Sequence, residues 1–204
     1  MNHIPSIYKL AVPDSGFARL GVVADTHVPD RIKALPPRLF ELLAGVDLIL
    51  HAGDLTHPRI LDELRQVAPV VAVQGNGDLL FRANWRRPML TVVELGEMKV
   101  GLTHGHGGLA DYIIEKFLFF ATGAYRYARY ERQVRQWFNG VQAIVFGHTH
   151  YPVNVVNEGV LLFNPGSVGP DYKARFGASI GRLTVNVTQR QVAGEILPLG
   201  APIP

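Results

Sequence analysis

The residues of this chain best suited to chemistry are aspartates, an asparagine and histidines that each follow a short apolar run. The runs read VVAD, LILHAGD, VVAVQGN, VGLTHGH and AIVFGHTH, in that order along the chain. Carboxylate and amide oxygens and imidazole nitrogens suit divalent ions such as manganese, iron or zinc. The chain has no cysteine, which excludes a thiolate nucleophile and a thiolate metal site. The candidate metal ligands are Asp25, His27, Asp54, Asn76, His104, His148 and His150.

The spacing of these residues indicates a paired metal site. In the D-T-H and H-T-H motifs the two ligands are separated by one residue, and side chains at i and i+2 of an extended segment point the same way. Each pair can therefore reach one ion. Asp54 can bridge two ions with its two oxygens, and Gly53 lets the backbone turn sharply toward them. Any one motif alone is typical of a turn or a hydrogen-bonded polar residue, so the interpretation depends on all five occurring in order.

The elements expected to position these ligands alternate between strand and helix. Residues 20–24, 48–50 and 70–73 are nearly continuous apolar runs, as strands buried on both faces require. Helix-like stretches separate them, which favours βαβ units and a mainly parallel sheet covered by helices. A hairpin over MLTVVELG and MKVGLTHG, a helical region and a strand-rich remainder follow. Because the carboxyl ends of parallel strands share one edge, the distant ligands can meet there.

Length and composition indicate one folded domain. The chain has 204 residues, of which 48% are hydrophobic and 18% charged, as in folded proteins and unlike disordered ones. A chain of this length can bury a substantial core without a second domain. Residues 1–18 hold two prolines and no sustained periodicity, so we expect an N-terminal extension outside the core. Residues 19–204 are expected to form the domain.

The N-terminal sequence, the hydropathy and the charge indicate the cellular compartment and the kinds of binding partner to expect. The first residues lack the basic start, the long apolar run and the small-residue cleavage site of a secretory signal. The most apolar stretch, residues 112–120, is about half of the ~18 apolar residues that suggest a membrane span. We therefore expect a cytoplasmic enzyme with no membrane partner. The net charge of +3, without a run of five like charges, favours an anionic ligand and leaves nucleic acid open as a partner.

Together these motifs resemble the calcineurin-like metallophosphoesterases, and specifically the YfcE-type group of small phosphodiesterases. The family order of D-x-H, G-D, G-N, H and G-H-x-H is present, and the NPGS segment at residues 164–167 also resembles the small group. The likeness runs from about Leu20 to Val187. It implies an α/β fold, a four-layer sandwich of two facing β-sheets flanked by helices, with metals at the strand ends. Only the resemblance supplies the second sheet.

The resemblance also implies a ligand set and an activity. One metal would be held by Asp25, His27, Asp54 and His150, and the other by Asp54, Asn76, His104 and His148. Manganese is the first choice, with iron, zinc, nickel or cobalt as alternatives. We predict a two-metal phosphodiesterase in which a hydroxide bridging the ions, opposite the shared aspartate, attacks phosphorus in line with the leaving group. The alternatives are a phosphomonoesterase on small metabolites and a non-catalytic protein-binding scaffold, as in the retromer subunit of the same superfamily.

One position departs from the family pattern. Many relatives carry, directly after the asparagine, a histidine that protonates the leaving group, whereas this chain has Gly77. A positioned acid contributes ~10²–10⁴-fold in rate, so its loss favours esters with good leaving groups. His106 is the candidate for a catalytic role or for phosphate binding, with a supporting hydrogen-bonded histidine as the alternative. Asp78 either acts in catalysis, by orienting a ligand or water, or caps a turn. Asn164 and Ser167 are expected to hold the loop that supports the site.

Two regions bear on substrate and partners. Arg82 and Arg86, in RANWRR, are candidates for phosphate binding, and the tryptophan between them offers a stacking surface. We therefore expect a small phosphorylated substrate, with a nucleotide as one choice; a solvated loop is the alternative. The predicted helical insertion, residues 108–140, carries arginines on one face and aromatic residues on the other. It could form a basic wall, a homo-oligomer contact or a cover over the sheet.

Overall fold

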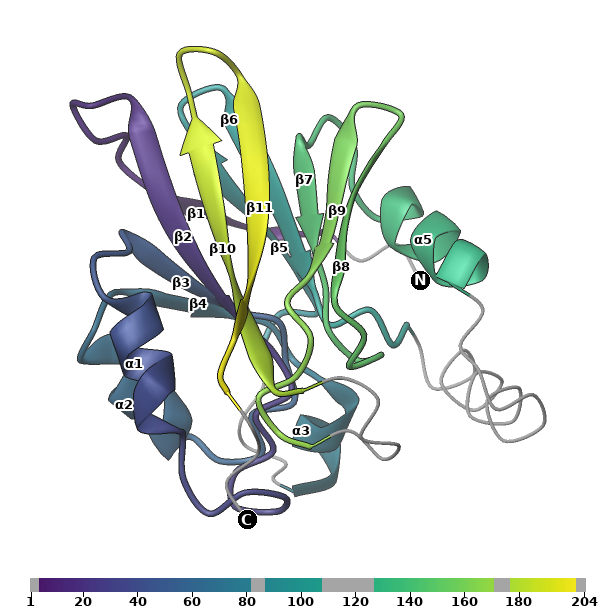
Figure 1. Cartoon of the computed structure of the whole chain (residues 1–204). Coiled ribbons are helices and arrows are strands. Elements are labelled where there is room, and N and C mark those ends of the chain that lie inside the picture. Colours follow the sequence, from purple (N-terminus) through teal and green to yellow (C-terminus); the bar gives the residue numbers. More distant parts are fainter. Residues whose placement is uncertain (1–3, 82–86, 108–126, 171–176, 201–204) are drawn as a thin grey trace.

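The computed structural model describes residues 4–81, 87–107, 127–170 and 177–200, which form two facing β-sheets with helices on their outer sides (Figure 1). No helix among these residues is long and apolar enough to cross a membrane. The helices are α1 (Pro37–Leu43), α2 (Arg59–Arg65), α3 (Asn76–Phe81) and α5 (Tyr127–Gln136). The strands are β1 (Ser6–Lys9), β2 (Phe17–Val23), β3 (Leu48–His51), β4 (Val70–Ala72), β5 (Leu90–Leu95), β6 (Met98–Thr103), β7 (Ala143–Val145), β8 (Val153–Asn157), β9 (Val160–Asn164), β10 (Ser179–Asn186) and β11 (Gln191–Pro198).

Both sheets are mixed. The five-stranded sheet has the order β11-β10-β2-β3-β4, and its β2, β3 and β4 run parallel through α1 and α2, as the alternating pattern predicts. The six-stranded sheet has the order β1-β5-β6-β7-β9-β8 and contains the predicted hairpin, in which β5 and β6 pair antiparallel. In this sheet β6, β7 and β9 are parallel neighbours. The second sheet that the family resemblance implied is therefore confirmed, and the mainly parallel single sheet is only part of the fold.

Three apolar layers hold the sandwich together. Leu20, Leu50, Val100 and Phe163 belong to the central layer between the two sheets. A second layer packs α1 and α2 against the outer face of the five-stranded sheet. A third packs α5 against the outer face of the six-stranded sheet. Burying strands on both faces explains why their sequences are apolar throughout instead of alternating.

The segment before residue 19 differs from the expected extension outside the core. Ser6–Lys9 forms β1, which pairs parallel with β5 at one edge of the six-stranded sheet. Tyr8, Leu10 and Val12 pack, partly buried, against the central layer. The expectation failed because the pairing partner lies more than eighty residues further along the chain, and no local periodicity records so distant a pairing.

Of the region predicted as a helical insertion, the structure describes residues 127–140, and Tyr127–Gln136 form the helix α5. α5 covers the six-stranded sheet with Tyr130, Val134 and Phe138, which are buried and lie at helical spacing. Next to the buried stripe, Arg135 forms ion pairs with Glu131 and with Glu158, which lies between β8 and β9. These contacts favour the reading of a helix that covers the sheet. Residues 108–126 of the insertion lie outside the described residues.

Candidate metal centre

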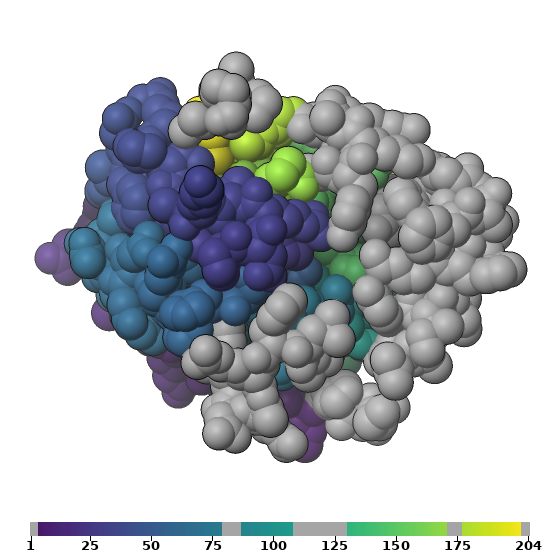
Figure 2. All heavy atoms as spheres, turned by 90° about the horizontal axis from the view of Figure 1, so that it is seen from below, coloured from purple at the N-terminus to yellow at the C-terminus, as the bar shows by residue number. Residues whose placement is uncertain are grey.

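The seven candidate ligands meet at one end of the sandwich. They follow β2, β3 and β4 in one sheet and β6 and β7 in the other, so the site lies where the carboxyl ends of both groups of parallel strands converge. On the face seen from below, the segment after β2 (indigo) adjoins the blue segment from the 50s to the 70s (Figure 2). All of the ligands except Asn76 are buried.

The backbone of the ligand pairs is left-handed, not extended as the sequence suggested. Asp25 and His27 have φ angles of 52° and 49°, and His148 and His150 have 67° and 58°. Such angles cost a non-glycine residue about 1–2 kcal/mol and gather at functional sites, where the surrounding structure imposes them. Asp25 and His27 do converge, with Nε2 of His27 3.9 Å from Oδ1 of Asp25. The extended backbone that was expected to bring them together is not present.

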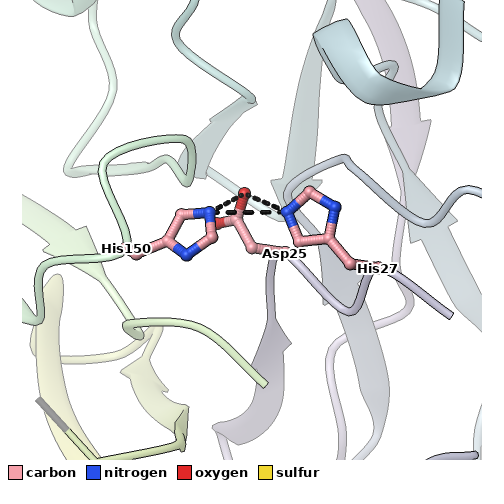
Figure 3. Close-up of side chains that lie close together, drawn as sticks. All are labelled: Asp25, His27 and His150. Atoms are coloured by element: carbon pink, nitrogen blue, oxygen red, sulfur yellow. Dashed lines mark hydrogen bonds and ion pairs between the residues drawn. The ribbon is translucent and has the colours of Figure 1, made fainter. Parts of the chain in front are cut away.

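Asp25, His27 and His150 form the tightest cluster. One possible ligand atom from each lies within 4.8 Å of the others, all of them buried. Nε2 of His150 is 3.4 Å from Oδ1 of Asp25, Nε2 of His27 is 3.9 Å from the same oxygen, and the two nitrogens are 3.4 Å apart (Figure 3). A carboxylate oxygen and two imidazole nitrogens, all of them atom types that bind metals, thus lie close together, an arrangement suited to a cation.

The second cluster is built around His104. Its Nε2 is 3.5 Å from Oδ1 of Asp54 and 3.0 Å from Oδ1 of Asn76. The ring of His148 lies edge-on to the ring of His104, with centroids 5.1 Å apart. Asp25, Asp54 and His104 also offer ligand atoms within 4.8 Å of one another, so the two clusters adjoin. The structure thus brings all seven predicted ligands together.

The donor set fits divalent metal ions. Oδ1 of Asp25 is buried and receives no hydrogen bond within the described part of the chain. A buried carboxylate oxygen in that state is unfavourable without a compensating charge, which a cation would supply. Burial lowers the pKa of His27 to about 3, so its ring is neutral at pH 7 and its lone pair is available for a metal. Both observations favour a site made to hold cations.

The two aspartates differ in their protonation. Burial alone would raise the pKa of Asp25, but the neighbouring imidazoles, with His150 foremost, hold it below its ordinary range. Burial raises the pKa of Asp54 to about 6, against the opposing effect of His104 and with a contribution from the charge of Asp25. Two carboxylates this close repel one another, so a bound cation would favour ionisation of both and release protons.

Asp78 holds the loop that carries Asp54. Its Oδ2 accepts the N–H of Asp54 at 3.2 Å and that of Gly75 at 2.8 Å, and its Oδ1 accepts the N–H of Thr56 at 2.8 Å. The bond to Gly75 is the one that the third residue of a helix makes in a capping box, here in α3. Both oxygens are therefore engaged with the backbone. This favours the loop-holding role of Asp78 over the catalytic one.

His51 and Thr26 connect the first two ligand loops. Nδ1 of His51 accepts the N–H of Gly53 at 3.2 Å, so its proton is on Nε2, 3.4 Å from Oγ1 of Thr26. Thr26 in turn donates to the carbonyl of Asp54 at 3.4 Å. Sequence reasoning missed Thr26, although its position between two ligands was a signal. Burial lowers the pKa of His51 to about 3, which keeps the ring neutral in this network.

The NPGS segment holds the loop of the H-T-H motif and the loop of Asp25, as expected. Nδ2 of Asn164 donates to the carbonyl of Gly147 at 2.9 Å, at the start of the H-T-H motif. Oγ of Ser167 lies 3.0 Å from the carbonyl of Asp25 and 2.6 Å from that of Gly169. Because both side chains are buried, these bonds are protected from competition with water.

Of the remaining predicted site residues, the structure describes His106. His106 is buried beside the metal ligands, with its ring centroid 5.3 Å from that of His104. Burial lowers the pKa of His106 to about 3, and the charge of His104 acts in the same direction. Arg82 and Arg86 lie outside the described residues. Arg87 is half-buried, and burial lowers its pKa against the charge of Asp78.

Comparisons with known proteins found similar sequences. Residues 19–189 match the calcineurin-like phosphoesterase superfamily domain. A probable metallophosphoesterase of Methanothermobacter thermautotrophicus is 35% identical over 90% of this chain and 94% of its own. Another, from Methanocaldococcus jannaschii, is 36% identical over 74% of this chain and 69% of its own.

Solved structures share the fold. Vps29 (Vacuolar Protein Sorting 29) from Cryptosporidium parvum has a TM-score of 0.61 at 22% identity, covering 83% of this chain and 86% of its own. An archaeal phosphodiesterase has a TM-score of 0.56 at 20% identity, covering 88% and 99%. Vps29 from Entamoeba histolytica, solved with zinc, has a TM-score of 0.55 at 23% identity, covering 89% and 99%. At these identities the likeness shows the fold alone.

Proposed function

The chain belongs to the calcineurin-like phosphoesterase superfamily, and we propose that it is a phosphodiesterase that uses two divalent metal ions. Membership of the family carries metal-dependent hydrolysis of phosphoesters. What we propose beyond the family's activity is the preference for diesters and the paired metal centre. Manganese is the ion we propose, on the basis of the mixed carboxylate, amide and imidazole donors.

The observation that carries the proposal is the way in which the carboxylate of Asp54 is shared. Its Oδ2 is 3.6 Å from Nε2 of His27, and its Oδ1 is 3.5 Å from Nε2 of His104. One carboxylate thus faces an imidazole of each cluster with a different oxygen. The N–H of Gly77 donates to Oδ1 at 2.7 Å and fixes the orientation of the group. A carboxylate held in this way could serve a metal on each side.

The ligands fall into two sets that share Asp54. Asp25, His27 and His150 complete the first set, and Asn76, His104 and His148 complete the second. Two ions bound there would polarise the phosphoryl group and acidify water at neutral pH. The protein's own part is to hold the ligands in place before binding, through the buried bonds of Asp78, Thr26 and Asn164 to the ligand loops.

The leaving group is the point at which this chain departs from its family. Gly77 stands at the position of the usual acid, and a side chain there would meet the carboxylate of Asp54, since an added Cβ would lie 3.0 Å from Oδ1. We propose that His106, which lies against the ring of His104, contacts the phosphate instead. A site without its own acid favours diesters whose leaving groups need no protonation. The nucleotide-like substrate is a further part of the proposal, and it depends on Arg82 and Arg86.

The test compares metal content with hydrolysis. The purified protein should contain or take up two equivalents of metal and should hydrolyse an aryl phosphodiester faster than the matching aryl phosphomonoester. Asp54→Asn should abolish turnover while the fold persists, and Asp62→Asn, at an exposed side chain on α2, should leave it unchanged. Faster monoester hydrolysis would overturn the diester preference. Protein that takes up no metal and shows no turnover would instead indicate a protein-binding scaffold.

A further inference from the structure

One side chain of the insertion reaches the metal centre. Tyr130, Val134 and Phe138 form the buried stripe of α5 and its C-terminal continuation, and Phe138 lies eight positions after Tyr130, which corresponds to about 12 Å at the rise of a helix. A Cβ added at Gly101, within β6, would lie 2.8 Å from the ring of Phe138, and one added at Gly105 would lie 2.3 Å from Oη of Tyr130. The two glycines are four positions apart, which corresponds to about 13 Å in an extended chain. α5 therefore runs along β6, and its Tyr130 end lies at the ligand loop.

The contacts of Tyr130 involve two of the predicted metal ligands. Its hydroxyl donates to the carbonyl of His104 at 3.3 Å. Its ring stacks on the ring of His148, with centroids 6.0 Å apart and planes only 10° from parallel. It also packs against Phe146, two residues before His148, with centroids 5.7 Å apart. Stacking of this kind favours aromatic ring pairs beyond the area that they bury.

Gly105 shows how closely the tyrosine is fitted to this loop. Its φ of 98° is a conformation that only glycine adopts readily, and the space where a Cβ would project is occupied by the phenol of Tyr130. The loop therefore turns directly after His104 and passes beneath the ring. As a result, one residue of α5 limits the positions of both the backbone of His104 and the ring of His148.

We propose that Tyr130 is a positioning residue for the metal that His104 and His148 would hold. This inference rests on the proposed two-metal function and adds to it that α5 helps to set the affinity of one of the two metal positions. The two ligands that Tyr130 contacts, His104 and His148, both belong to the set proposed for that one metal. The effect should therefore fall on one binding step and spare the other.

The test is a calorimetric titration of chelator-stripped full-length protein with Mn²⁺, together with the visible absorption of the Co²⁺ form. Wild type should bind two equivalents. Tyr130→Leu should weaken one of the two steps about 10- to 100-fold, the range for groups that support a metal ligand, and should change the Co²⁺ spectrum of that step. Tyr130→Phe keeps the stacked ring and should weaken the same step by a smaller factor.

Phe138→Leu is the matched control, because it shortens another buried ring of the same stripe that packs on β6 away from the ligands. It should lower the melting temperature as Tyr130→Leu does and leave both binding steps unchanged. Equal weakening by Phe138→Leu, or unchanged binding in Tyr130→Leu, would overturn the role of Tyr130. Wild type that binds fewer than two equivalents would refute the two-metal function itself.

Discussion

The substitution Asp78→Asn best distinguishes a structural role of Asp78 from a catalytic one. The carboxylate accepts three buried backbone N–H groups, from Asp54, Gly75 and Thr56. Asparagine has nearly the same shape but only one acceptor oxygen. If that oxygen keeps the two bonds of Oδ2, the amide NH2 faces the N–H of Thr56, and two donors then oppose each other in a buried place.

The expected loss is large for a single substitution. A hydrogen bond to a charged group contributes about 1.5–3 kcal/mol, and a buried N–H left without a partner costs about 1–3 kcal/mol. One lost bond and two weakened ones therefore amount to roughly 3 kcal/mol of unfolding free energy. For a protein of this size, about 2–4 °C of melting temperature corresponds to each kcal/mol, so we expect a drop of about 6–12 °C.

The assay combines thermal unfolding with hydrolysis at rising metal concentration. If Asp78 holds the loop of Asp54, the variant melts early, needs more metal and recovers most of its turnover when metal is saturating. Asp62→Asn, which removes an exposed carboxylate 2.8 Å from Arg65, should change the unfolding free energy by less than about 1 kcal/mol. An unchanged melting temperature with a ~10²–10⁴-fold lower turnover at saturating metal would refute this reasoning and assign Asp78 to the chemistry.

Three further outcomes are expected. Asn164→Ala leaves a buried carbonyl without its donor, so it should lower the unfolding free energy by about 1–3 kcal/mol and weaken metal uptake, whereas Asn154→Ala, at an exposed residue, should not weaken metal uptake. Gly75→Ala puts a Cβ 2.1 Å from the predicted bridging carboxylate and should end hydrolysis; Gly177→Ala, whose Cβ meets nothing within 4 Å in the described part of the chain, should match wild type. Burial lowers the pKa of His51 to about 3 in the folded protein. Its contribution to the free energy of unfolding is therefore complete above pH 6.5 and is lost as the pH falls toward 3. Denaturant titrations of metal-stripped protein should show the free energy of unfolding falling by up to about 1.4 kcal/mol per pH unit over this range. The fall should be smaller for His51→Gln, and an equal fall in both proteins would contradict the prediction.

Local sequence predicted the individual elements well where burial dictated them. The apolar runs at β2, β3 and β4 and the hairpin of β5 and β6 were visible because strands buried on both faces must be apolar and a tight turn must connect neighbours. β1 was missed because it is four residues long and exposed on most of its length, so its sequence carries no such pattern. It exists as a strand because β5 offers a free edge.

The sequence by itself determined which side chains could bind metal, because residue type fixes donor chemistry and position after an apolar run fixes the end of a strand. It could not determine how Asp25 and His27 converge. Their left-handed backbone is imposed by loops from elsewhere, with the N–H of Asp25 donating to the carbonyl of Gly53 and that of His27 to Asp54.

Only the tertiary structure brought Tyr130 to His148 and divided Asp54 between two clusters, because these contacts join segments that no local pattern relates.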